Sequence, residues 1–168
     1  MSSNVLVGKK QTRFNPLDEV EEFMAAQEWS YHRAGFDELL VEVPGRWCEY
    51  HVSFFWQEEV NVLQLFVSLD MQIAATRSDE AMRLMGLINQ RLAFGHFELA
   101  EGSLTPAYRY AYLLTGQTAI RGVFLEELLD FSLGECERFY PAFQFTILGE
   151  KCAAEAVEIA LLDTLGEA

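Results

Sequence analysis

The sequence predicts an α+β fold in which helices cover one side of an antiparallel sheet. The first observation is the stretch 47–71, where apolar and polar residues alternate in two runs separated by the polar turn 57–59. Two alternating runs joined by a short turn are typical of a β-hairpin. The second observation is that segments with helical periodicity stand before and after this hairpin. We expect the sheet to contain a three-strand meander and a separate hairpin.

The central hairpin is expected to have one covered face and one polar face. In its first half, Glu49, His51 and Ser53 stand between apolar residues. This period of two is the period of a β-strand, whose successive side chains point to opposite faces. The residues expected on the covered face are Cys48, Tyr50, Val52, Phe54, Trp56, Leu63, Leu65, Val67, Leu69 and Met71.

We expect a single domain over residues 15–168, preceded by a flexible arm at residues 1–14 that shows no periodicity. Asn15 and Pro16 predict the start of a helix, because asparagine caps helices and proline fits the first helical position. Several carboxylates follow, near the positive end of the helix dipole. The apolar residues at helical spacing in this segment are expected to face the sheet.

Residues 29–43 allow two short strands before the turn at Pro44 and Gly45. Further on, Ser78 is expected to cap a second helix over residues 79–92. The apolar residues of that helix spread over more than one stripe, which is typical of a helix buried on two sides. They include Met82, Leu84, Met85, Leu87 and Ile88.

This wide apolar helix surface predicts a homodimer. Contiguous exposed apolar surface is a liability in a soluble monomer, and twofold pairing of the second helix would bury it. The alternative is that a last helix, expected over residues 153–165, folds back over the same surface within one chain.

Residues 97–114 predict a second hairpin, with Tyr108 and Tyr110 on one face and Arg109 on the other. Tyrosine and arginine are the residues that dominate partner surfaces. Together with His51 on the polar face of the central hairpin, these three are the candidate partner or pocket residues. The alternative is that the tyrosines line the face covered by helices.

A long helix with a broad apolar stripe is expected after the turn at residues 116–118. Pro141 should kink or break it, because proline lacks a backbone donor and clashes with the preceding turn. Gly149 then marks a stop before the last helix.

The chain of 168 residues has a net charge of −14, and its 12 basic residues are scattered. Such a surface repels phosphate backbones and anionic membranes, so we expect neither nucleic-acid nor membrane partners. No apolar run has the length of a membrane span, and the first residues lack the order of a signal peptide. We therefore expect a cytoplasmic protein, whose acidity favours basic protein partners or serves solubility alone.

No sequence pattern points to an enzyme. His32, His51 and His96 have no second ligand at metal-binding spacing, so no metal or other cofactor is expected. The three cysteines show no pairing motif, Cys136 stands between two glutamates, and Cys48 alternates into the expected core. This pattern favours reduced, partly buried, structural thiols. Phosphate-binding glycine loops, esterase elbows and zinc-protease motifs are also absent from the sequence.

Several segments resemble a known bacterial family. The end of the chain, residues 135–168 with the motif YPAFQ at 140–144, closely resembles the end of YbjN-domain proteins. NPLDEVEEFMAAQEW from Asn15, GRWCEYHVSFFW from Gly45 and GHFEL from Gly95 also resemble segments of that family. Where its members commonly have serine before the last helix, this chain has Cys152, which weakens the expected N-cap.

The resemblance implies a fold similar to that of type III secretion chaperones and a role as a sensory transduction regulator. It implies no catalytic residue. The leading interpretation is a non-enzymatic, chaperone-like or regulatory module that binds segments of a partner protein. The alternative is a small-molecule sensor or enzyme with a pocket between sheet and helices, using His51, Arg109 and Tyr110.

Overall fold

The structure is a computed structural model that describes residues 14–100, 102–116 and 119–165. Apart from Phe14, the expected N-terminal arm lies outside the described residues. In chain order the elements are α1 (Pro16–Ala26), β1 (Tyr31–Arg33), β2 (Glu38–Pro44), β3 (Glu49–Gln57), β4 (Val62–Ser68), η1 (Ala75–Arg77), α2 (Ser78–Asn89), β5 (His96–Leu99), β6 (Pro106–Leu113), α3 (Gly122–Leu148) and α4 (Ala153–Leu165).

The predicted α+β fold class is confirmed. Within the described residues the strands form one six-stranded antiparallel sheet in the order β1-β2-β3-β4-β6-β5. The two short strands expected in residues 29–43 are β1 and β2, so the meander before the β5–β6 hairpin has four strands rather than three. Strand β1 is a three-residue edge strand with the sequence Tyr-His-Arg.

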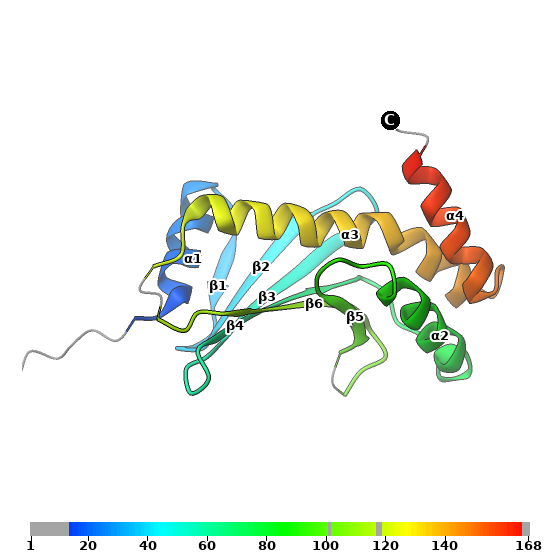
Figure 1. Ribbon diagram of the computed structural model, residues 1–168, viewed down its shortest axis with the longest axis horizontal. Helices are drawn as coiled ribbons and strands as arrows, with labels where there is room; N and C mark the ends of the chain where they lie inside the picture. The colour runs from blue at the N-terminus through cyan, green and yellow to red at the C-terminus, as the bar shows by residue number, and fades with distance from the viewer. Residues whose placement is uncertain (1–13, 101, 117–118, 166–168) are drawn as a thin grey trace, which may run out of the picture.

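Helices α1 and α3 lie over one face of the sheet, and Figure 1 shows α3 running across the strands. The expected covered face of the central hairpin is the observed one. Phe54 of β3 stands opposite Leu65 of β4, which in turn stands opposite Tyr110 of β6. Residues that stand opposite one another in neighbouring strands share a face. Phe54 and Leu65 are both buried on the face that the helices cover.

The start of α1 is as predicted. Asn15 is the N-cap, and its side-chain oxygen accepts a hydrogen bond of 3.0 Å from the backbone N–H of Leu17. This satisfies one of the donors that a helix start leaves without a helical partner.

The bounds of α2 differ from the prediction. The helix begins at Ser78 and ends at Asn89, rather than running from Asp79 to Leu92. Ser78 is not the cap, because its hydroxyl donates back to the carbonyl of Ala75, at 2.9 Å, in the 3₁₀ turn η1.

Helix α3 is one helix of 27 residues that continues through Pro141. Of the expected kink or break, the break is therefore wrong. Proline cannot donate to the carbonyl four residues earlier, that of Glu137. This carbonyl instead accepts a hydrogen bond of 3.0 Å from the indole of Trp47. The helix ends as expected at Gly149, which takes the left-handed conformation with φ +76°.

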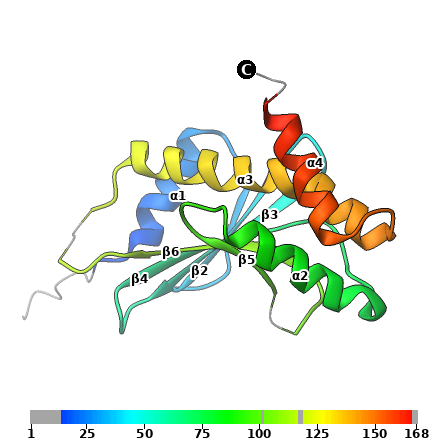
Figure 2. The same cartoon turned by 45° about the vertical axis from the view of Figure 1, so that its right-hand side comes forward.

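Helix α4 packs against α2 and α3, and Figure 2 shows α2 and α4 side by side. Three of the residues expected in a dimer interface, Leu84, Met85 and Ile88, are buried within the chain, where α2 contacts α3, α4 and β5. The packing of α4 on α2 agrees with the intramolecular alternative. On that helix Met82 is 60% exposed and Leu87 is half-buried. A homodimer stays a prediction, but an interface on α2 would have to rest on these two side chains.

Among the helices of the described ranges, none combines the length and the apolar character needed to cross a membrane.

Candidate binding surface on the open face of the sheet

Among the described residues, no helix covers the sheet face opposite α1 and α3, and we term it the open face (Figure 1). One row of neighbouring side chains crosses it from edge to edge. Leu40 stands opposite Ser53, Ser53 opposite Phe66, and Phe66 opposite Arg109. The row continues to His32 on β1 and to His96 on β5.

A hollow of about 550 Å³ lies in the middle of the open face. Its floor includes Phe55, Gln64 and Phe66, and its sides include Asp37 and Glu98. Ligand sites in proteins typically enclose about 300 to 1,000 Å³, so this hollow has room for several side chains of a bound segment.

Arg109 lies at the centre of this surface and is held on three sides. Its Nε donates to Oε1 of Gln64 at 2.9 Å, and its Nη1 lies 3.4 Å from Oε2 of Glu98. The guanidinium carbon is 5.3 Å from the ring centre of Phe66, a cation–π distance. An arginine with its position set in this way can offer its remaining donors to a ligand with little loss of side-chain entropy.

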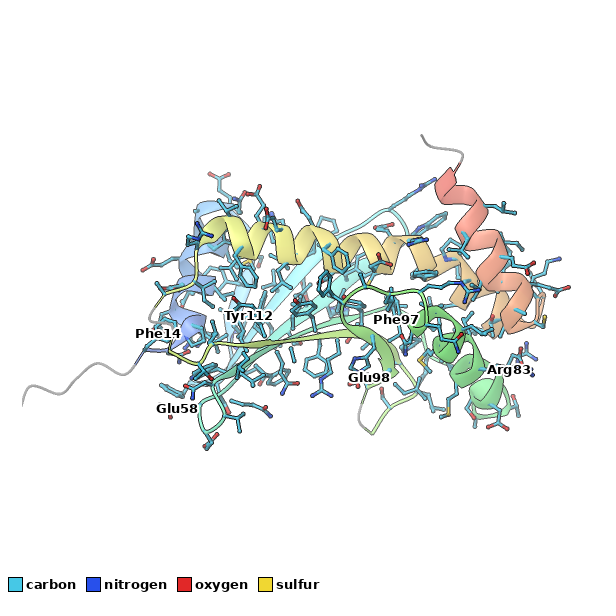
Figure 3. The ribbon with its side chains drawn as sticks, viewed as in Figure 1. Phe14, Glu58, Arg83, Phe97, Glu98 and Tyr112 are labelled. Carbon is cyan, nitrogen blue, oxygen red and sulfur yellow. The ribbon has the colours of Figure 1, made fainter. Side chains whose placement is uncertain are left out.

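Two aromatic rings form the apolar part of the floor. Phe55 and Phe66 meet edge to face, with ring centres 5.6 Å apart, and both are half-buried. Figure 3 shows Glu98 on the side of the sheet away from α3, whereas Tyr112 lies on the α3 side. Next to Glu98, the Nε2 atom of His96 lies 3.0 Å from its carboxylate.

The open face is acidic around this aromatic floor. Asp37 lines the hollow, Glu38 stands opposite Phe55, and Glu42 stands opposite His51. Arg109 is the cation that the same hollow contains, and it is already paired with Glu98. The electrostatic potential of the surface therefore favours a ligand that carries positive charge.

The structure separates the candidate residues predicted from the β6 sequence. Tyr108 is fully buried on the helix side, where its hydroxyl donates to the carbonyl of Phe94 at 2.8 Å. Burial raises the pKa of Tyr108, so it stays protonated at neutral pH. Tyr110 lies on the same side, with its ring centre 6.3 Å from that of Phe94. The tyrosines thus line the helix-covered face, as the alternative interpretation states.

His51 shares the open face with Arg109 but not its hollow. It lines a second hollow of about 380 Å³ with His32 and Leu40, and the two hollows meet at Ser53. Because Arg109 and His51 point away from the helices, they cannot line a pocket between sheet and helices together with Tyr110.

Sequence reasoning missed Phe55, Phe66, Gln64 and Glu98. A signal for the two phenylalanines was present, because each occupies a position of its strand that should be polar if that face met only water. Gln64 and Glu98 are recognisable only once β4, β6 and β5 are known to be neighbours.

The cysteines lie apart from this surface. Cys136 is buried and Cys48 half-buried, and burial raises the pKa of both thiols. Cys152 is exposed, which corrects the expectation that it is partly buried. It precedes α4 as an exposed N-cap position, and its N–H donates to Glu155. The described residues contain no cluster of ligands that could hold a metal ion.

Comparison with known proteins identifies the family. Residues 16–145 match the model of the YbjN family, described as "Putative bacterial sensory transduction regulator". The chain belongs to the YbjN family. The match covers α1, the whole sheet, α2 and most of α3. The open face of this YbjN chain therefore lies entirely within the part that defines the family.

A solved structure supports the YbjN fold. The chain is similar to the crystal structure of YbjN from E. coli, described as "a putative transcription regulator", with a TM-score of 0.54. The two share 8% sequence identity, and the similarity covers 73% of this chain and 87% of the other. At that identity the likeness establishes the fold alone. No curated protein matches this chain.

Proposed function

We propose that this YbjN-family protein is a non-enzymatic regulatory module that binds an extended segment of a partner protein on its open face. The observation that carries the proposal is the aromatic floor of Phe55 and Phe66 beside a fixed Arg109, on a face that no helix of the described residues covers. Aromatic rings and arginine contribute most to binding energy at protein interfaces.

The regulatory part of the proposal follows the description of the family as regulators of sensory transduction. The binding part follows from shape and charge. The hollow is open and acidic, which suits a polypeptide with apolar and basic side chains better than a phosphorylated ligand. We also propose that the protein acts in the cytoplasm, because its three unpaired cysteines are typical of a reducing compartment.

A small-molecule sensor is the second candidate, and the size of the hollow favours it. About 550 Å³ falls within the range of small-ligand sites. If this candidate is right, the ligand occupies the open face rather than the space between sheet and helices.

Affinity capture from native lysate with matched phenylalanine variants tests the proposal. Phe66→Ser removes the centre of the floor, whereas Phe94→Ser removes an equally apolar side chain that is 58% exposed on the helix side. We expect the wild type and Phe94→Ser to capture the same protein in stoichiometric amount, and Phe66→Ser to lose it. The bound segment, made as a synthetic peptide, should then protect amides of β3, β4 and β6 from hydrogen exchange.

Two results would contradict a protein-binding role of this face. One is equal capture of the partner by a folded Phe66→Ser variant. The other is release of a stoichiometric metabolite from the denatured wild type, with no protein partner, which would establish the small-molecule alternative.

A further inference from the structure

The first described residue, Phe14, packs against the core, and the next residue contacts the loop at the rim of the hollow. Asn15, the cap of α1, donates from its side-chain amide to the carbonyl of Phe36 at 2.7 Å. The next residue, Asp37, lines the hollow. Residues that precede Phe14 are therefore tethered beside the open face.

The tethered segment is long enough to cover this surface. An extended chain spans about 3.3 Å per residue, so residues 5–13 can reach about 30 Å from Phe14. Adjacent strands are about 4.8 Å apart, which places Arg109 on β6 about 14 Å across the sheet from β2. The reach of the segment therefore exceeds the distance to the far side of the hollow.

The order of residues in the segment matches the order of the surface. Arg13, Lys10 and Lys9 come closest to the tether, and the apolar run 5–7 lies beyond them. On the surface, the carboxylates of Asp37 and Glu38 are nearest to the tether, and the phenylalanine floor lies further in. A segment that ran inward from the tether would therefore place its charges at the acidic rim and its apolar residues at the aromatic floor.

We propose that residues 5–13 dock on the open face of their own chain and occupy the surface until a partner displaces them. The inference rests on the proposed function for its regulatory meaning, but docking itself requires no second protein. Because a short tether produces an effective concentration in the millimolar range, contacts too weak for a free peptide suffice here.

The outer face of α1 is the competing acidic surface near the tether. Two of its carboxylates, Asp18 and Glu21, each lie 3.3 Å from the guanidinium of Arg33. The hollow on this helix face is lined by one aromatic residue, Tyr31, rather than by two rings packed on each other. The open face is therefore the better match for the segment.

Carbodiimide cross-linking of the full-length protein at low micromolar concentration tests the proposal, since it joins lysine amines to carboxylates in contact. We expect links within one chain from Lys9 or Lys10 to Asp37, Glu38 or Glu98. In Phe66→Ser their yield should fall roughly tenfold, the factor that corresponds to about 1.4 kcal/mol. In the matched Phe94→Ser variant the yield should be unchanged.

Links from these lysines only to carboxylates of α1, only between chains, or to none at all would overturn the inference. Equal yields in Phe66→Ser and the wild type would overturn it as well. Such a failure leaves the proposed function standing if Phe66→Ser still loses the captured partner. The opposite outcome can also be distinguished. If the intrachain links form but Phe66→Ser captures as much partner as the wild type, the docked segment is supported and the proposed function is contradicted.

Discussion

The indole Nε1 of Trp47 donates a hydrogen bond of 3.0 Å to the backbone carbonyl of Glu137. This carbonyl is the one that Pro141 leaves without its usual helical donor. The Trp47 ring also stacks on Tyr140, with centres 6.1 Å apart. A side chain from the loop before β3 thus replaces a missing bond inside α3.

The first prediction is that Trp47→Phe destabilises the protein by about 1 kcal/mol, because it keeps a ring but removes the donor. In a Pro141→Ala background the restored N–H can reach the carbonyl of Glu137. The same Trp47→Phe change should therefore cost less there, and urea unfolding of the four proteins measures the difference as a double-mutant cycle. An equal cost in both backgrounds would show that the indole does not substitute for the helical donor.

Glu80 of α2 should stabilise the start of α4. Its Oε1 accepts a hydrogen bond of 2.7 Å from the N–H of Ala153, the first residue of that helix. Glu80→Ala is expected to lower the unfolding free energy by about 1 kcal/mol, the usual value of a lost helix cap. Asp79→Ala, a neighbouring exposed carboxylate, is the control and should cost less in the same urea titration. A cost no larger than that of the control would count against this cap.

Phe54→Ala should cost about 3 to 5 kcal/mol, because Phe54 is 0% exposed and its loss leaves a cavity. Phe55→Ala, one residue along the same strand but on the open face, is expected to cost clearly less. Urea unfolding of both variants compares the two faces of β3 directly. A smaller loss for Phe54 than for Phe55 would mean that the strand faces are inverted.

Replacing Gly86 or Gly95 by alanine should change the free energy of unfolding in opposite directions. A Cβ at Gly86 of α2 meets no atom within 4 Å, so Gly86→Ala should stabilise the helix by about 0.5 to 1 kcal/mol. Gly95 has φ +63°, and its Cβ would collide with the Tyr108 ring and lie 2.7 Å from the carbonyl of Arg109. Gly95→Ala should therefore destabilise by about 1 to 3 kcal/mol or more. Thermal or urea melting would refute this pairing if both changes had the same sign.

Glu135 should make stability depend on pH. Burial raises the pKa of its carboxyl above the ordinary 4.5, although Arg138 opposes the shift. The folded state then binds the proton more tightly, so this group's stabilising contribution is complete below pH 4.5 and is lost as the pH rises through the raised pKa. The side chain of the Glu135→Gln variant cannot ionise. The stability of this variant should therefore increase relative to that of the wild type as the pH rises.

The measurement for Glu135 is the urea midpoint of both proteins between pH 4 and about pH 7.5. Glu126→Gln, at an exposed position of the same helix, is measured beside it as the matched control. A Glu135→Gln difference that stays constant over this range would contradict the buried-carboxyl explanation.

Much of the local structure could be predicted from the residues alone. The start of α1 follows from Asn15 and Pro16, and the faces of β3 and β4 follow from alternation, because both depend on neighbours within a few positions. The presence of Arg109 on the face opposite to Tyr108 follows from the same period of two.

What spans long sequence distances could not be predicted in this way. Pro141 was expected to kink or break α3. The donor that replaces its missing N–H belongs to Trp47, 90 residues before the Glu137 carbonyl that accepts the hydrogen bond. Likewise, the breadth of apolar surface on α2 was visible in the sequence, but not whether α4 or a second subunit covers it.

The candidate site shows the same division most clearly. The sequence by itself determined which residues lie on the two faces of each strand, because side-chain direction is a local consequence of backbone geometry. Only the tertiary structure decided that β6 inserts between β4 and β5, which brings Arg109 against Gln64, Phe66 and Glu98. Strand order depends on which distant segments together bury the most apolar surface. The local periodicity of a strand does not determine which strand becomes its neighbour.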